Sequence, residues 1–226
     1  MIKFFFDAID CISKKEEVPY FIDTKIRNLH SSLSISESGE ILFYILQNNN
    51  AGEVFRYFSK NQALQSIFLS LDNLRRVPQN KGKSSNAFEH SIKVLDLVPI
   101  DNIDLRWVAL FHDLGKYDSY ISDQNFNRHQ IYSYDMALHF CLLYEIQNRE
   151  KICSIIKNHM FPLDYQRNPN WTKEAIIRLI DRCGKENVID TIEFSYYDKQ
   201  SENNVKEFLD IIIELKSKVQ EILNER

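Results

Sequence analysis

The spacing of apolar residues constrains the fold of this chain more than any other feature. Apolar residues recur every three or four positions, which is the pattern of an amphipathic α-helix with one face on a core. This spacing covers residues 16–32, 36–48, 51–59, 87–97, 103–116, 128–147, 150–159, 172–183 and 185–197. It is clearest near the C-terminus, at Val205, Phe208, Leu209, Ile212, Leu215, Val219 and Ile222. No segment sustains the period-two alternation of a strand. The sequence therefore predicts an all-α fold.

Helix ends are marked by their own chemistry. Ser34 precedes Glu37 by three residues and Asn86 precedes Glu89 by three, which is the capping-box spacing. Gly184 stands where the preceding helix needs a left-handed residue to stop. These signals indicate where three of the predicted helices begin or end.

Two polar stretches divide the predicted helices. Residues 79–85 (QNKGKSS) suggest a boundary, which gives an N-terminal helical portion at 1–80 and a second domain at 81–226, packed together as one unit. Residues 161–170 hold two of the five prolines and are predicted to form a loop.

Charge and cysteine usage exclude several classes of protein. The net charge of −4 argues against nucleic acid held on a diffuse basic face, and no DNA partner is expected. The four cysteines form no C-x-x-C pair, so neither a thiolate zinc site nor a redox motif is indicated. An acid interrupts the apolar start at residues 1–7, and no segment is long enough to cross a bilayer. We expect a cytoplasmic protein with no membrane partner.

The histidines carry the clearest chemical signal, because five of the six lie between positions 90 and 159. His112 and Asp113 are adjacent within residues 105–116 (LRWVALFHDLGK), where they interrupt an apolar run. A buried imidazole and carboxylate must be hydrogen-bonded, ion-paired or metal-bound. A divalent cation would satisfy both, with His90 reaching it from an earlier helix and Lys116 adding a positive charge. The alternative without a metal is a structural His–Asp hydrogen bond at a helix end.

Mixed imidazole and carboxylate ligands favour one or two divalent ions of Mn, Ni, Co, Fe or Zn, with Mg less favoured.

Several segments carry a resemblance to a known family. Residues 88–91 (FEHS) and 105–116 are similar to the HD superfamily of metal-dependent phosphohydrolases, whose pattern is a histidine, a His-Asp pair and a distant aspartate. Within it, the chain looks like the HD domain of bacterial CCA-adding tRNA nucleotidyltransferases. The further matches to that branch are 36–42, 68–74, 126–129 (FNRH), 156–160 (IKNHM), 177–180 (IRLI), Gly184 and Tyr197-Asp198.

The resemblance, which spans about residues 34–200, implies an HD-domain helical bundle with an N-terminal helical extension. It implies metal ligation by His90, His112, Asp113 and Asp198, although Asp190 and Asp181 compete with Asp198. His129 and His159 would hold a second metal or contact phosphate or ribose.

Substrate contacts are expected from the residues around this pattern. Lys116 would offset charge on the phosphoryl oxygens, which makes Asp113 and Lys116 the expected catalytic pair. Arg128 is a further candidate for substrate binding, and Arg106 either contacts substrate or holds the helical body. His30 and His139 are interpreted as structural.

The head that adds nucleotides in that branch, a Gly-Ser loop followed by Asp-x-Asp, is not found. The implied activity is therefore hydrolysis of phosphomonoester or 2′,3′-cyclic phosphodiester bonds in nucleotides or RNA ends. One alternative is an HD hydrolase acting on cyclic dinucleotides, dinucleoside polyphosphates or dNTPs. Another is a non-catalytic RNA-binding helical module with a vestigial site. The sequence leaves open whether the chain forms a homodimer and whether a separate partner chain supplies the missing head.

Overall fold

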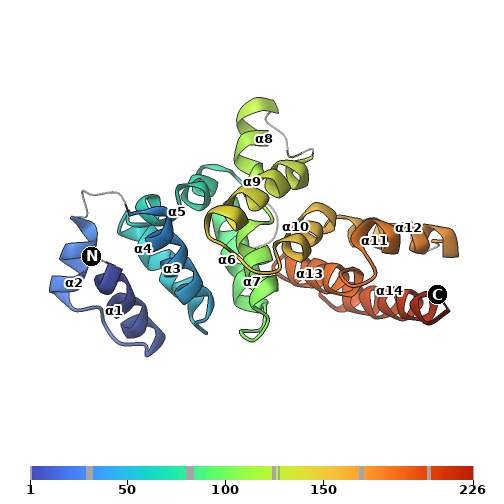
Figure 1. Ribbon diagram of the computed structural model, residues 1–226, viewed down its shortest axis with the longest axis horizontal. Helices are drawn as coiled ribbons and strands as arrows, with labels where there is room; N and C mark the ends of the chain where they lie inside the picture. Colours follow the sequence, from blue (N-terminus) through green and yellow to red (C-terminus); the bar gives the residue numbers. More distant parts are fainter. Residues whose placement is uncertain are drawn as a thin grey trace.

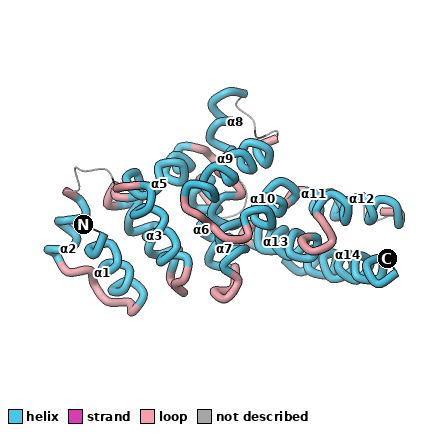
Figure 2. The backbone as a smooth tube through the Cα atoms, in the orientation of Figure 1, coloured by secondary structure: helices cyan, strands magenta, loops and turns pink. Residues whose placement is uncertain are grey.

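The computed structural model describes residues 2–28, 33–79, 84–123, 126, 128–167, 171–202 and 205–225. Within these ranges every regular element is a helix, and strand-like pairing is limited to an isolated bridge between Pro78 and Asn86. The all-α prediction is confirmed (Figure 2). None of the described helices is long and apolar enough to span a membrane. His30 and residues 80–83 of the predicted boundary lie outside the described residues.

The N-terminal helices lie at one end of an elongated molecule (Figure 1). The capping box at the start of α3 is confirmed, since the Ser34 side chain accepts from the Glu37 backbone N–H and the Glu37 carboxylate accepts from the Ser34 backbone N–H. The predicted helix at 16–32 is shorter than expected, and α1 and α5 were not predicted. The elements are α1 (Ile2–Ser13), α2 (Tyr20–Arg27), α3 (Ile35–Leu46), α4 (Ala51–Lys60), α5 (Leu64–Asn73) and the 3-10 turn η1 (Leu74–Arg76).

The central helices follow in chain order, and α8 projects from the body (Figure 1). The helix predicted to run from 103 to 116 is interrupted by a turn at residues 112–114, so the His-Asp pair lies between two helices. Asn86 caps the first of the central helices by accepting from the Glu89 backbone. The elements are α6 (Ala87–Leu97), α7 (Ile103–Phe111), α8 (Gly115–Asp123), α9 (His129–Leu143) and α10 (Arg149–Asn158).

The C-terminal helices form the opposite end (Figure 1). They are α11 (Phe161–Arg167), α12 (Lys173–Cys183), α13 (Val188–Gln200) and α14 (Val205–Glu225). The loop predicted at 161–170 is wrong for residues 161–167, because Pro162 stands in the first turn of α11, where its missing N–H costs no hydrogen bond. Gly184 ends α12 with a φ of +86°, as its position predicted.

The apolar side chains form two cores. The larger one runs from Phe5 in α1 to Ile156 in α10 and includes Phe194, so the N-terminal helices share a core with α6, α7 and α9 across the predicted boundary. The smaller one joins Tyr165 to α12, α13 and α14. Since α13 contributes residues to both, it connects the C-terminal helices to the central ones.

Candidate metal centre

Six polar side chains from five helical segments meet where the central helices pack on α13. His90 comes from α6, His112 and Asp113 follow α7, His129 begins α9, and His159 follows α10. Asp198 comes from the last turn of α13. All six are at most 8% exposed. The structure thus brings together the four residues expected for the first metal and the two histidines suggested for a second, whereas the competing acids Asp181 and Asp190 lie elsewhere.

His90, His112, Asp113 and Asp198 form the first group. His90 Nε2 lies 2.8 Å from Asp198 Oδ1 and 3.4 Å from Asp113 Oδ2. His112 Nε2 lies 3.3 Å from the same Asp113 oxygen and 3.9 Å from Asp198 Oδ1. Ligand atoms of His90, His112 and Asp113 all fall within 4.8 Å of one another. This spacing suits a single cation at their centre.

Asp113 also belongs to a second group, with His129 and His159. Its other oxygen, Oδ1, lies 3.4 Å from His129 Nε2. The His159 ring lies 5.5 Å, centroid to centroid, from both His129 and His112. Since each Asp113 oxygen faces a different group, this carboxylate can bridge two cations.

Backbone carbonyls orient three of the imidazoles in the same way. Nδ1 of His112 lies 2.9 Å from the Ala109 carbonyl oxygen, and Nδ1 of His159 lies 2.7 Å from that of Ile156. His129 makes the equivalent contact with the carbonyl of Phe126 at 2.9 Å. Carbonyls in the last turn of a helix lack intrahelical partners, which explains why His112 and His159 are held just after α7 and α10. With Nδ1–H donating to a carbonyl, Nε2 presents its lone pair to the cluster.

His90 is oriented by a side chain that sequence reasoning missed. Ser201, the residue after α13, has its Oγ 2.9 Å from His90 Nδ1 and donates its own proton to the Asp198 carbonyl at 2.7 Å. The serine hydroxyl therefore accepts from His90 Nδ1–H. No local signal marks Ser201, because its partner lies 111 residues away in the sequence.

The cluster has the donor chemistry of a divalent metal site. His112 Nε2 is buried and has no hydrogen-bond partner, and His90 Nε2 faces a carboxylate oxygen at 2.8 Å. A nitrogen lone pair pointed at a carboxylate is unfavourable unless a proton or a cation lies between them. Imidazole nitrogens together with ionised carboxylates are the ligands that first-row divalent metals take.

Electrostatics prepare the cluster to bind a cation at neutral pH. Burial, aided by the neighbouring His112, lowers the pKa of His159 to about 3, and burial also lowers the pKa of His129. Burial alone would raise the pKa of Asp113, but His112 and Lys116 outweigh it and hold that pKa well below its usual range. Conversely, Asp113 overcomes the effect of burial on His112 and raises its pKa. A bound metal would take the place of the additional proton that this raised pKa favours on His112.

Lys116 adjoins the cluster from the first turn of α8. Its Nζ lies 2.5 Å from Asp113 Oδ2 and 3.0 Å from Gln79 Oε1. The Phe126 ring lies beneath the ammonium, 5.8 Å from Nζ to its centroid. Gln79, which is 5% exposed, is a second residue that the sequence did not single out. Lys116 therefore places a fixed positive charge against the cluster.

Gly115 is the first residue of α8 and lies against the first turns of α9. A Cβ at Gly115 would lie 2.5 Å from the His129 carbonyl oxygen and 2.5 Å from the Ser133 nitrogen. Its own N–H donates to Ser133 Oγ at 2.9 Å. Gly115 therefore opens α8 and lets the first turn of α9, which carries His129, approach closely.

Other candidates lie outside this arrangement. Arg128 is exposed at the N-cap of α9 with a φ of 64°. Arg106 is buried and donates to the carbonyls of Leu46, Val98 and Asn48, so its role is to hold the helical body and substrate contact is excluded. Of the competing acids, Asp190 pairs with Lys151 at 2.9 Å and Asp181 is exposed on α12. His139 is exposed beside Phe140 on α9.

A comparison with known protein families finds a match in the central part of the chain. The family model of the HD domain matches residues 87–185. This region contains all four histidines of the cluster and Asp113, whereas Asp198 and Ser201 lie beyond it on the C-terminal side. No curated protein matches the chain, so the closer likeness to CCA-adding nucleotidyltransferases stays a prediction.

Proposed function

We propose that this chain, which carries an HD domain at residues 87–185, is a divalent-metal phosphohydrolase. One observation carries the proposal: four imidazoles present Nε2 toward two carboxylates that stay ionised at neutral pH, in a buried cluster. Burial would raise the pKa of Asp198, but its hydrogen bond to His90 and the neighbouring imidazoles lower it instead. His90, His112, Asp113 and Asp198 would hold the first cation, and Asp113, His129 and His159 a second.

The reaction follows from the groups around the cluster. A bound divalent cation would polarise a phosphoryl oxygen and lower the pKa of a water molecule. Since burial lowers the pKa of both His129 and His159, these two rings add no positive charge to the second group. Lys116, which pairs with Asp113 at 2.5 Å, is in position to turn toward a phosphoryl oxygen and offset the charge that develops on it.

For the substrate, we propose nucleotides or RNA ends with phosphomonoester or 2′,3′-cyclic phosphodiester bonds. The support is the resemblance of residues 34–200 to the HD-containing part of CCA-adding enzymes, which implies this hydrolytic chemistry. The net charge of −4 favours a small substrate or a nucleic-acid end over an extended duplex. HD hydrolysis of cyclic dinucleotides, dinucleoside polyphosphates or dNTPs is the second candidate, because it uses the same cluster.

The test combines metal binding with turnover. The purified protein is stripped with a chelator, then loaded separately with Mn²⁺, Ni²⁺, Co²⁺ and Mg²⁺. It is assayed on 2′,3′-cyclic AMP, 2′-AMP, an aryl phosphate, a cyclic dinucleotide and a dNTP. At a free metal concentration about 100 times Kd, bound metal should stabilise the fold by about 2.7 kcal/mol.

The matched variants are His112→Ala and His139→Ala, since both remove a histidine but only His112 belongs to the cluster. His112→Ala removes a ligand of the first cation, so it should abolish turnover and reduce the stabilisation by metal. His139→Ala should retain both. Absence of metal binding in the native protein would refute the proposal. Metal binding without turnover of any substrate would favour a non-catalytic module.

A further inference from the structure

A second concave site lies away from the metal centre, between α3, the start of α7 and the turn that joins α9 to α10. It has a volume of about 540 Å³, within the range of small-molecule pockets. None of its lining residues belongs to the His/Asp cluster. One wall comes from α3, outside the HD-domain match, and the rest from inside it. The cavity therefore depends on the packing of the N-terminal helices against the HD domain.

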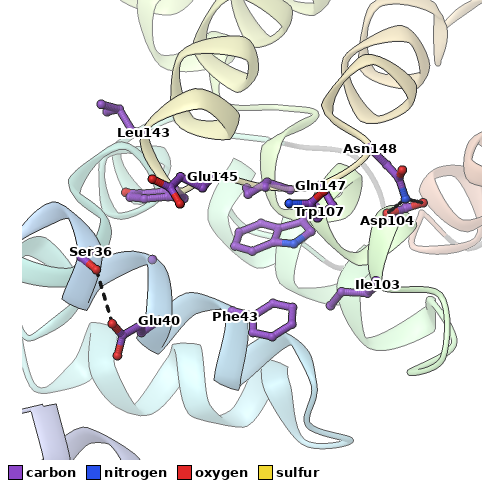
Figure 3. A pocket seen from close by; sticks show the side chains of 13 residues that line it. Ser36, Glu40, Phe43, Ile103, Asp104, Trp107, Leu143, Glu145, Gln147 and Asn148 are labelled. Carbon is purple, nitrogen blue, oxygen red and sulfur yellow. Dashed lines mark hydrogen bonds between the residues drawn. The ribbon is translucent and has the colours of Figure 1, made fainter.

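The interior of the cavity is aromatic and apolar. Trp107, which is 3% exposed, lies at its base, with Phe43 on the facing helix and Leu143 at the opposite rim (Figure 3). Phe43 is 44% exposed and Leu143 is 37% exposed, although both are large apolar side chains. Gly39 forms part of the wall, where a Cβ would come within 3.1 Å of the Tyr144 ring. A ligand with an apolar body would cover this surface.

The rim of the cavity is acidic. Three carboxylates line it, those of Glu40, Glu145 and Asp104, and Figure 3 shows the Trp107 indole between Glu145 on one side and Asp104 on the other. Asp104 pairs with Lys151 at 3.2 Å, but Lys151 also pairs with Asp190 at 2.9 Å. Among the described residues, no ion pair is found for Glu40 or Glu145. The cavity thus carries an excess of negative charge around a largely apolar floor.

We propose that this cavity binds a small organic cation, with its apolar body against Phe43 and Leu143, above the buried Trp107, and its ammonium group facing Glu145 and Glu40. An accessible aromatic ring, here that of Phe43, and nearby carboxylates both attract an ammonium group. An anionic ligand such as a nucleotide would meet repulsion from the rim. The site is independent of the proposed hydrolytic function, because it shares no residue with the cluster.

The two tryptophans provide a built-in control for a binding experiment. Trp107 lies in the cavity, whereas Trp171 packs on Tyr165 beside the smaller core. The full chain is labelled with ¹⁵N-tryptophan and titrated with phenethylamine, with its neutral analogue 2-phenylethanol, and with the anion 3-phenylpropionate. The Trp171→Phe variant assigns the remaining indole signal to Trp107.

Phenethylamine should shift the Trp107 signal saturably and leave that of Trp171 in place. The alcohol should bind about tenfold more weakly, and the anion more weakly still. Glu40→Gln combined with Glu145→Gln should weaken amine binding about fivefold and barely change alcohol binding. Glu221→Gln, which removes an exposed carboxylate on α14, should change neither.

Three results would overturn the proposal. One is equal affinity for the amine and the alcohol, which would leave the carboxylates without a role. The second is no shift of Trp107 up to about 10 mM amine, where even millimolar sites fill. The third is a parallel shift of both indoles, which would indicate non-specific association.

Discussion

Ser201 Oγ lies 2.9 Å from His90 Nδ1 and donates its proton to the Asp198 carbonyl. One hydroxyl therefore orients a histidine from α6 and fixes the backbone beside an aspartate from α13. Both partners belong to the candidate metal centre. Groups that orient metal ligands in this way commonly contribute as much to affinity as a weak ligand does.

Replacing this hydroxyl should weaken metal binding without unfolding the protein. Ser201→Ala leaves His90 Nδ1–H without its acceptor, so the ring can rotate and Nε2 is no longer held toward the metal site. We expect Mn²⁺ affinity to fall about 10- to 100-fold, measured by competition with a chelating dye. Ser59→Ala, which removes another buried serine hydroxyl far from the cluster, should leave affinity unchanged. Equal affinity in Ser201→Ala and native protein would show that the hydrogen bond does not position His90.

Removing the charge of Lys116 should lower turnover without lowering metal affinity. In Lys116→Met the aliphatic stem remains but the ammonium 2.5 Å from Asp113 Oδ2 is lost. Metal affinity should hold or rise, since a competing positive charge is gone, while kcat/KM should fall about 100- to 1000-fold. Lys93→Met removes a half-buried lysine that contacts Ser84, and serves as the control. A parallel loss of metal binding would mean that Lys116 supports the site only structurally.

Acidification should destabilise the metal-free protein through His159. Burial lowers its folded-state pKa to about 3, whereas a histidine in the unfolded chain takes up a proton at about pH 6.5. Between these values the unfolded state holds more protons, so the free energy of unfolding falls as pH falls, by up to about 1.4 kcal/mol per pH unit. The raised pKa of His112 acts in the opposite direction, since it favours the folded state at low pH.

A variant separates the contribution of His159. Urea denaturation in chelator between about pH 7 and 4.5 should show a shallower loss of stability for His159→Gln than for the native protein. His139→Gln, at an exposed histidine, should follow the native slope. If His159→Gln and native protein lose stability in parallel, His159 is not buried in its neutral form.

A methyl group at Gly115 should disturb the metal centre through the helix contact. The Cβ of Gly115→Ala would meet backbone atoms of His129 and Ser133 at 2.5 Å, so α9 must move away from α8. We expect a destabilisation of about 1–3 kcal/mol in urea unfolding, together with weaker metal binding. Gly39→Ala meets only the Tyr144 side chain, at 3.1 Å, and should cost less. Equal costs for the two would contradict the close approach at Gly115.

Local patterns predicted much of the fold because helices depend on neighbouring residues. The bounds expected for the helix at 87–97 agree with α6, and Ser34 and Gly184 mark helix ends as predicted. The errors arose where local signals conflicted. The helix predicted for residues 103–116 was continued past Phe111, where the structure has a turn, and the prolines at 161–170 led to a loop being predicted in place of the short helix α11.

The sequence by itself determined an all-α chain with a His-Asp motif and a set of candidate ligands, since helix periodicity and residue chemistry are local properties. Only the tertiary structure decided how these ligands meet: the Asp113 oxygens face separate groups, Ser201 orients His90, and Gln79 contacts Lys116. It also created the acidic cavity at Trp107, which needs α3 packed beside α7. The physical reason is that each of these contacts joins segments far apart in the chain, and their meeting depends on how the helices pack into a shared core.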